Sequence, residues 1–252
     1  MPRPGNAGTP WTSRASYHSR RAGLVQAVTL DATGTLLHCP RLGEIYAEVL
    51  GRHGVAIDAA EAGRLVRLVW QEMSCSADPA HDRFAADPLG ERGFWRRVVD
   101  RVLEYLGHSA SPFAAAELFH RFGQGAAWEV YPEVPSVLEA LAADGLRLAV
   151  ISNWDHRLPW LLDQLGLAGR FAAVVYSAAV GVEKPHPEIF ARALSVLGVP
   201  AERALHVGDR QVEDVEGAEA VGMRGLLLRR GPGKPGDLAD LAALPAVVRE
   251  VC

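Results

Sequence analysis

The sequence predicts an α/β fold, namely a doubly wound parallel sheet interrupted by an inserted all-helical domain. First, short apolar, β-branched runs alternate with helix-length segments, which is the spacing of βαβ units with helices on both faces of a sheet. Second, residues 42–129 carry apolar residues at helical intervals and contain no β-rich run. Third, a chain of 252 residues that is 49% hydrophobic can bury a sizeable core.

The strands are expected where the apolar runs lie. Val25 to Leu30 forms the first, ends at Asp31 and runs into the turn Thr33-Gly34-Thr35. Four later runs have the same character, at residues 146–151, 172–176, 204–207 and 225–228. Helices are expected between them, for example at 132–143 and at 187–197. We therefore assign the α/β core to residues 25–40 and 130–252.

The inserted helical domain is assigned to residues 41–129. Two sets of apolar residues in it follow a helical period: Leu65, Leu68 and Val69 in one, and Trp95, Val98, Val99 and Val102 in the other. The polar segment 76–88 lies between them and is expected to be a loop or hinge.

Residues 1–24 are expected to form a disordered tail. They hold four arginines, no acidic residue and many Gly, Pro, Ser and Thr, so they bury too little apolar surface to order. A basic N-terminus without acidic residues also resembles an organelle transit peptide. Two early prolines and the lack of an amphipathic period count against that alternative.

Charge and cysteine content narrow the class of partner. The net charge of −4 argues against a dedicated nucleic-acid binder, and no apolar run reaches the length of a membrane span. The cysteines Cys39, Cys75 and Cys252 are odd in number and far apart, which predicts neither a disulfide framework nor a zinc site. The expected setting is a reducing, cytoplasmic compartment, and the expected partner is a small molecule. The oligomeric state stays open.

Polar groups follow the predicted strands, and in an open α/β sheet reactive groups lie beyond the carboxyl ends of the strands. In chain order these residues are Asp31, Ser152, Asn153, Lys184, Asp209 and Asp214. Carboxylates, a hydroxyl and one ammonium are the groups needed for metal-assisted transfer of an anionic group.

Four motifs around these residues match those of the haloacid dehalogenase superfamily in order. They are VTLDATGTLL (Val28 to Leu37), LAVISN (Leu148 to Asn153), the Lys184-Pro185 pair of GVEKPHPEIF, and HVGDRQVED (His206 to Asp214). Residues 25–228 therefore resemble that superfamily, and the pattern from YPEV to HVGD resembles its branch of haloacid dehalogenase-like hydrolase domain-containing proteins. The resemblance implies a hydrolase with a Rossmann-like catalytic core and a helical cap of the C1 type inserted after the first motif.

Asp31 is the candidate nucleophile, because a carboxylate can attack phosphorus and hold the transferred group as an acyl phosphate. Taken alone, an Asp before a Gly-containing turn is more often a turn former. Ser152 and Asn153 are expected to donate hydrogen bonds to the phosphoryl oxygens. Their alternative role is to cap a helix that begins near His156.

Lys184 is the candidate for neutralising the charge of the phosphate and of Asp31. Of 26 basic residues, only Lys184 and Lys234 are lysines. A compact ammonium suits a place where a point charge is needed without the steric demand of a guanidinium. The alternative is a lysine on a surface loop.

A magnesium site is expected at the acidic strand ends, since Asp209 and Asp214 supply the hard oxygen ligands that Mg²⁺ takes. The resemblance implies that Asp31, the backbone carbonyl of Thr33 and Asp209 hold the ion, with Asp214 acting directly or through water. For Asp214, capping of the following helix is an equal alternative.

Thr33 marks a departure from the family pattern. Phosphatases of the superfamily usually carry a second Asp two residues after the nucleophile as general acid and base. A hydroxyl does not shuttle protons near neutral pH as a carboxylate does, so each proton-transfer step could lose roughly 10² to 10⁴ in rate.

Three functions remain open at this stage. The leading one is a Mg²⁺-dependent phosphatase of a small phosphorylated metabolite, acting through an aspartyl phosphate on Asp31. The others are a binding or regulatory protein of low turnover, suggested by Thr33, and a 2-haloacid dehalogenase. Dehalogenases of the superfamily lack the acidic fourth motif that Asp209 and Asp214 supply here. The insert offers candidate specificity groups: His81, Asp82, Arg83, Trp95 and Arg96.

Overall fold

The computed structural model describes residues 25–75, 78–231 and 238–250. The expectation of a disordered tail at 1–24 therefore lies outside the described residues. Within the described ranges, no helix is both long and apolar enough to cross a membrane.

A five-stranded parallel sheet forms the centre of the core, with the strand order β5-β4-β1-β6-β7. The strands are β1 (Ala27–Leu30), β4 (Arg147–Ser152), β5 (Ala173–Tyr176), β6 (Ala204–Gly208) and β7 (Arg224–Leu227). Each of the five predicted strands is present, and the prediction of a doubly wound, Rossmann-like sheet is confirmed. The chain leaves β1 on one side through β4 and β5 and returns to its other side through β6 and β7.

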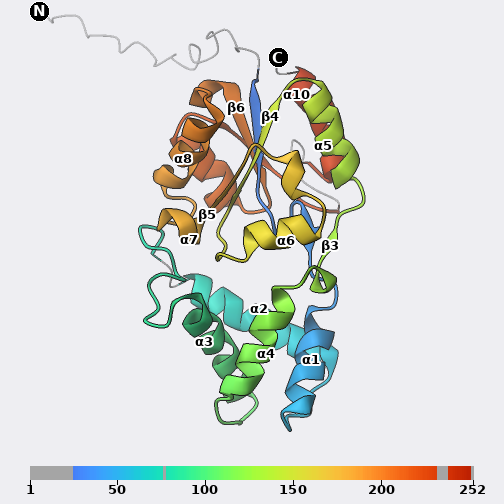
Figure 1. Cartoon of the computed structure of the whole chain (residues 1–252), viewed down its shortest axis with the longest axis vertical. Helices are drawn as coiled ribbons and strands as arrows, with labels where there is room; N and C mark the ends of the chain where they lie inside the picture. Colours follow the sequence, from blue (N-terminus) through green and yellow to red (C-terminus); the bar gives the residue numbers. More distant parts are fainter. Residues whose placement is uncertain (1–24, 76–77, 232–237, 251–252) are drawn as a thin grey trace, which may run out of the picture.

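Two layers of helices cover the sheet, one on each face (Figure 1), and residues of β1 belong to the apolar cores on both faces. Val28 and Leu30 belong to the apolar core shared with α5 (Val134–Ala143), α6 (Leu158–Gln164) and α10 (Leu244–Glu250). Ala27 belongs to the core on the opposite face, with α8 (Pro187–Leu197) and α9 (Gly217–Ala220). The short helix α7 (Ser177–Val180) follows β5, and a π-helical turn at Gln211–Glu216 precedes α9.

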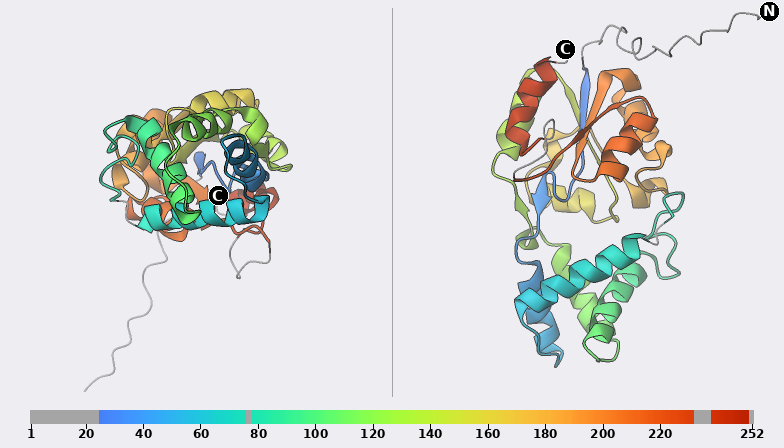
Figure 2. Two further views of the ribbon diagram at one scale, coloured as in Figure 1. Left: turned by 90° about the horizontal axis from the view of Figure 1, so that it is seen from below. Right: turned by 180° about the vertical axis from the view of Figure 1, so that it is seen from behind.

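Four helices lie beyond the carboxyl end of the sheet, as Figures 1 and 2 show. They are α1 (Leu42–Arg52), α2 (Ala59–Cys75), α3 (Gly90–Tyr105) and α4 (Pro112–Phe122), and they share an apolar core of their own. The antiparallel pair β2 (Leu37–His38) and β3 (Glu129–Val130) carries the chain into and out of this helical insert. The insert therefore stands directly over the strand ends that bear the candidate residues.

Candidate active site

The sheet register brings the predicted strand-end residues together. Leu30 of β1 pairs with Val150 of β4 on one side and Val207 of β6 on the other. The residue after Leu30 is Asp31, whose backbone N–H donates to the Val207 carbonyl at 2.9 Å. Ser152, at the end of β4, thus lies beside Asp31, and Asp209 follows β6 on its other side.

Asp31 is buried, and its two carboxylate oxygens differ in their partners. Oδ1 accepts hydrogen bonds from the Ser152 hydroxyl at 2.9 Å and from Lys184 Nζ at 2.6 Å. No described residue donates to Oδ2. Burial raises the pKa of Asp31. The positive charge of Lys184 lowers this pKa, and the negative charge of Asp214 raises it further. The carboxylate is therefore held through one oxygen, while the other is left with its lone pairs unused.

Lys184 lies just before α8, is 3% exposed, and joins two carboxylates. Its Nζ donates to Asp31, to Asp214 Oδ1 at 2.5 Å and to the Ile151 carbonyl at 2.9 Å. Burial disfavours the charged amine, but the two carboxylates outweigh it and raise the pKa of Lys184. The ammonium is thus fixed in its charged form beside Asp31, which rules out the alternative of a surface loop lysine.

Asn153 holds the backbone of Lys184. Its Oδ1 accepts from the Lys184 N–H at 2.7 Å, and its Nδ2 donates to the Lys184 carbonyl at 3.0 Å. In this structure the amide therefore positions the lysine, and its donation to a phosphoryl group stays a prediction. The helix-capping alternative for Ser152 and Asn153 is wrong, because α6 begins only at Leu158 and has no side-chain cap.

Asp214 is held by three donors. Oδ1 accepts from Lys184 and from His206 Nε2 at 3.2 Å, and Oδ2 accepts from the Arg210 backbone N–H at 2.9 Å. Burial alone would raise the pKa of Asp214, but the charge of Lys184 and the bond from His206 lower it. Asp214 lies inside the π-helical turn Gln211–Glu216 and bonds back to Arg210, the residue just before it. The alternative that Asp214 caps the following helix is wrong, because α9 has Glu216 at its N-cap and no side-chain cap.

His206 bonds Asp214, and Thr29 bonds the other ring nitrogen of His206. Neither residue was predicted from the sequence. Burial lowers the pKa of His206, so the ring is neutral. Because a carboxylate only accepts, Nε2 carries the proton to Asp214 and Nδ1 faces the Thr29 hydroxyl at 2.8 Å. A sequence signal for this pair does exist, since each is a polar residue inside an otherwise apolar strand.

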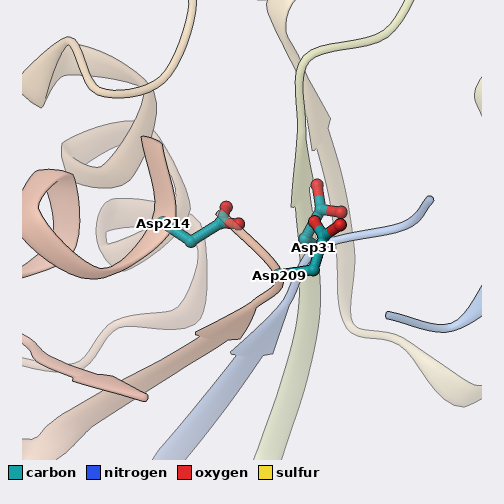
Figure 3. Close-up of side chains that lie close together, drawn as sticks. All are labelled: Asp31, Asp209 and Asp214. Atoms are coloured by element: carbon teal, nitrogen blue, oxygen red, sulfur yellow. The ribbon is translucent and has the colours of Figure 1, made fainter. Parts of the chain in front are cut away.

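The side chains of Asp31, Asp209 and Asp214 lie close together (Figure 3). One oxygen from each lies within 4.8 Å of the others. A Cβ on Gly34 would come within 2.5 Å of Asp209 Oδ2, so glycine is required for this close approach. Three carboxylates against one ammonium leave excess negative charge, and the oxygen donors suit Mg²⁺. The donor set therefore fits the expected ion.

Asp209 shows the effect of this crowding most clearly. Asp209 is exposed to solvent on one side. Its partial desolvation in the cleft and the like charges of Asp31 and Asp214 together raise the pKa of Asp209 to about 7. Without a cation, an ionised Asp209 thus destabilises the folded state near neutral pH. A divalent cation bound to the cluster would remove this repulsion.

Replacing Asp209 with Asn is therefore expected to change stability and metal binding in opposite directions. The folded protein holds a proton on Asp209 up to about pH 7 and the unfolded chain only to about pH 3.8, so this group lowers stability as pH rises between those values. At pH 8 without metal, Asp209→Asn should raise the melting temperature by about 2–4 °C. That gain should vanish toward pH 4, and calorimetry should show at least roughly tenfold weaker Mg²⁺ binding than in the wild type.

The control is Asp163→Asn, an exposed carboxylate on α6 outside the cluster. It should leave both quantities unchanged. Equal Mg²⁺ affinity in the wild type and Asp209→Asn would remove Asp209 from the metal site.

Thr33 is exposed beyond the strand ends, and its hydroxyl is hydrogen-bonded to Trp154. Its Oγ1 accepts from the indole N–H of Trp154 at 3.0 Å. The position that carries an Asp in most phosphatases of the family thus holds a hydroxyl fixed by a tryptophan.

A cavity of about 520 Å³ lies between the helical insert and the strand ends. Asp31, Thr33 and Lys184 line it from the core, and Arg83 and Trp95 line it from the insert. Of the specificity candidates, His81, Asp82 and Arg96 do not line it.

Among the polar contacts that join the insert to the core, two come from insert side chains that line the cavity. Arg83 donates to the buried carboxylate of Glu183, the residue before Lys184, with Nε at 2.7 Å. The Trp95 indole donates to buried Asp155 at 2.7 Å.

Comparison with known proteins identifies the family of the chain. Residues 25–222 match the model of the haloacid dehalogenase-like hydrolase family. A curated relative, haloacid dehalogenase-like hydrolase domain-containing protein 3 of Danio rerio, is 33% identical over 83% of this chain and 87% of its own. Its name is that of the branch that the pattern from YPEV to HVGD resembles.

Two further proteins show the range of the relatives. The glyceraldehyde 3-phosphate phosphatase of Methanopyrus kandleri is 36% identical over 54% of this chain and 60% of its own. The L-2-haloacid dehalogenase structure from Xanthobacter autotrophicus shares the fold at a TM-score of 0.70, with 22% identity, and covers 91% of this chain and all of its own. With its four motifs, its parallel sheet and these similarities, the chain belongs to the haloacid dehalogenase-like hydrolase family.

Proposed function

We propose that the protein is a Mg²⁺-dependent phosphatase that hydrolyses monoesters of a small phosphorylated metabolite through an aspartyl phosphate on Asp31. The observation that carries the proposal is the asymmetric binding of Asp31. Oδ1 is held by Ser152 and Lys184, and Oδ2 is unbonded within the described residues, in a residue that lines the cavity. A carboxylate oriented in this way is suited to attack by Oδ2.

In the first step, Asp31 Oδ2 forms a bond to phosphorus, and the bond from phosphorus to the ester oxygen breaks. The electron pair leaves with the ester oxygen, which takes a proton from solvent water to give the free alcohol. Lys184 and the Ser152 hydroxyl balance charge around the carboxylate as the phosphoryl group arrives. In the second step, a water oxygen forms a bond to phosphorus, and the bond from phosphorus to Asp31 Oδ2 breaks. One proton of that water stays on the inorganic phosphate and the other returns to solvent, and the Asp31 carboxylate is restored.

Asp31, Asp209 and Asp214 are the side chains that would hold Mg²⁺, together with the backbone carbonyl of Thr33. The bound ion would neutralise the charge of the phosphate and of the crowded carboxylates. The contacts of Asp214 with Lys184, His206 and Arg210 favour contact with the ion through water for this residue.

The acidic cluster favours phosphoryl transfer over the two alternatives. Dehalogenases of the superfamily lack the acidic fourth motif, whereas Asp209 and Asp214 are both present here. The phosphatase activity named for the Methanopyrus relative supports the same choice. A binding or regulatory protein of low turnover is favoured only by Thr33. We place the protein in the cytoplasm, where phosphorylated metabolites are abundant.

A panel assay tests the proposal. Purified protein is incubated with phosphate monoesters and with 2-haloacids, each with Mg²⁺ and with a chelator, and released phosphate and halide are measured. We expect phosphate release that depends on Mg²⁺ and no halide release. Halide release would favour the dehalogenase, and no release of either product would favour the binding protein.

Thr33→Asp tests the departure from the family pattern. If the missing carboxylate limits attack by water, the phosphoenzyme forms faster than it decays and accumulates. The added carboxylate should then raise turnover by about tenfold or more, within the range of general acid–base catalysis. Rapid-quench measurement of phosphoprotein should show a burst in the wild type that shrinks in the variant.

Thr33→Val serves as the control, because it removes the hydrogen bond from Trp154 without adding a carboxylate. It should not raise turnover. A wild type without a burst, together with a slower Thr33→Asp variant, would show that another group already transfers the proton.

A further inference from the structure

The cavity above Asp31 is unusually rich in tryptophan. Of the six tryptophans in the chain, four line it: Trp70, Trp95, Trp128 and Trp154. All four are partly exposed, although they lie in the interior between insert and core. A volume of about 520 Å³ also exceeds what a two- or three-carbon phosphate ester fills. Aromatic side chains that keep accessible surface in such a cavity favour a flat organic group.

Three of the four tryptophan rings are fixed by their own N–H groups. The indole N–H of Trp95 donates to Asp155 at 2.7 Å, and that of Trp128 donates to the Phe122 carbonyl at 2.9 Å. The indole of Trp154 is held in the same way by Thr33. These three donors are therefore already used. Trp70 and Trp95 also stack on each other, with ring centroids 5.5 Å apart, so a ligand meets only the ring surface that stays accessible, in a set orientation.

Tyr46 supplies a polar group that lacks a partner. This residue of α1 lines the cavity and is only 3% exposed. Within the described part of the chain, its hydroxyl makes no hydrogen bond. Burial raises the pKa of Tyr46, so the hydroxyl keeps its proton as a donor. An acceptor on the ligand would give this hydroxyl a hydrogen-bond partner.

Arg67 supplies an uncompensated positive charge on the same cavity. The three other arginines that line it are paired, Arg83 with Glu183, Arg157 with Asp155 and Arg210 with Glu213. Arg67, on α2, has no carboxylate partner among the described residues. An anionic acceptor therefore suits the insert side of the cavity better than a neutral one.

We propose that the protein selects phosphate monoesters whose organic part is aromatic and carries a carboxylate remote from the phosphate, with the ring received by the tryptophans and the carboxylate by Tyr46 and Arg67. This inference rests on the proposed function for the role of the phosphate. It narrows the proposed substrates from small phosphorylated metabolites in general to those with a flat, anionic organic group.

Binding of phosphonates, which contain no ester bond to hydrolyse, tests the inference without turnover. Calorimetry with Mg²⁺ compares methylphosphonate, benzylphosphonate and 4-carboxybenzylphosphonate. In the wild type we expect benzylphosphonate to bind about tenfold more tightly than methylphosphonate, and the carboxylate to add about another tenfold. Tyr46→Phe and Arg67→Gln should each remove most of the carboxylate gain and leave benzylphosphonate affinity within about twofold.

Matched controls lie outside the cavity. Tyr105→Phe changes an exposed tyrosine of α3, and Trp160→Leu changes an exposed tryptophan of α6. Neither should alter the affinities, whereas Trp70→Leu should weaken both aryl phosphonates. Melting curves establish that each variant is folded. If Tyr46→Phe does not fold, Arg67→Gln, at an exposed position, still tests the affinity gain from the ligand carboxylate.

Equal affinities for the three phosphonates in the wild type would overturn the inference. So would a carboxylate gain that survives in both Tyr46→Phe and Arg67→Gln. If the preference is found but no phosphate ester is hydrolysed, the proposed function fails and the ligand class stands. If esters are hydrolysed and the preference is absent, the proposed function stands and the ligand class fails.

Discussion

Asp31→Asn is expected to reduce phosphate release by a factor on the order of 10⁴ to 10⁶, the range seen when an enzyme loses its nucleophile. An amide cannot attack phosphorus to give an acyl phosphate. The substitution keeps the size of the side chain and one oxygen that accepts from Ser152 and Lys184. The variant should therefore fold, and the loss should appear in kcat more than in KM.

Steady-state phosphate release measures this effect, with Asp163→Asn as the control for an Asp-to-Asn change elsewhere. The control should retain full activity. A folded Asp31→Asn variant with wild-type turnover would exclude Asp31 as the nucleophile.

Lys184→Met is expected to abolish turnover and also to destabilise the fold by about 3–5 kcal/mol, the usual cost of breaking a buried ion pair. Lys184 is 3% exposed and separates Asp31 from Asp214. Methionine would fill a similar volume but leave both carboxylates without their cation. The two carboxylates would then repel each other in a buried site.

The double variant Lys184→Met/Asp214→Asn separates the two effects. Removing the second carboxylate should recover part of the stability in urea unfolding, whereas turnover should not return. A Lys184→Met variant as stable as the wild type would contradict the role that we assign to this ion pair.

The same network predicts how stability depends on pH. The pKa of Asp214 is lowered below its usual 3.8 in the folded protein, so its contribution is present above that pH and is lost as the pH falls further. The pKa of Lys184 is raised above its usual 10.5, so its contribution is present below that pH and is lost above it. The pair therefore stabilises the fold across the neutral range.

The convergence of Asp31, Ser152 and Asp209 could be predicted from the sequence. Each follows a short apolar run, and parallel strands place their carboxyl ends at one edge of the sheet. This inference needs only local patterns and one topological rule. For that reason it did not depend on the lengths of the segments between the strands.

Contacts between distant loops could not be predicted in this way. Asn153 contacts the backbone of a lysine 31 residues later, and this depends on how the segment before α8 is placed. The Trp154 bond to Thr33 spans 121 residues. The helical spacing around Trp95 favoured a packing role. In the structure Trp95 packs against the apolar core of the insert, donates to Asp155 and also lines the cavity.

The most direct test of the account is to find where the phosphoryl group is held during turnover. The enzyme is mixed with substrate and Mg²⁺, quenched in acid within milliseconds, and digested for mass spectrometry. We expect one phosphoryl group on the peptide that contains Asp31, labile to hydroxylamine as an acyl phosphate is, and absent from Asp31→Asn. A phosphoryl group on any other residue, or steady turnover in Asp31→Asn, would contradict the account.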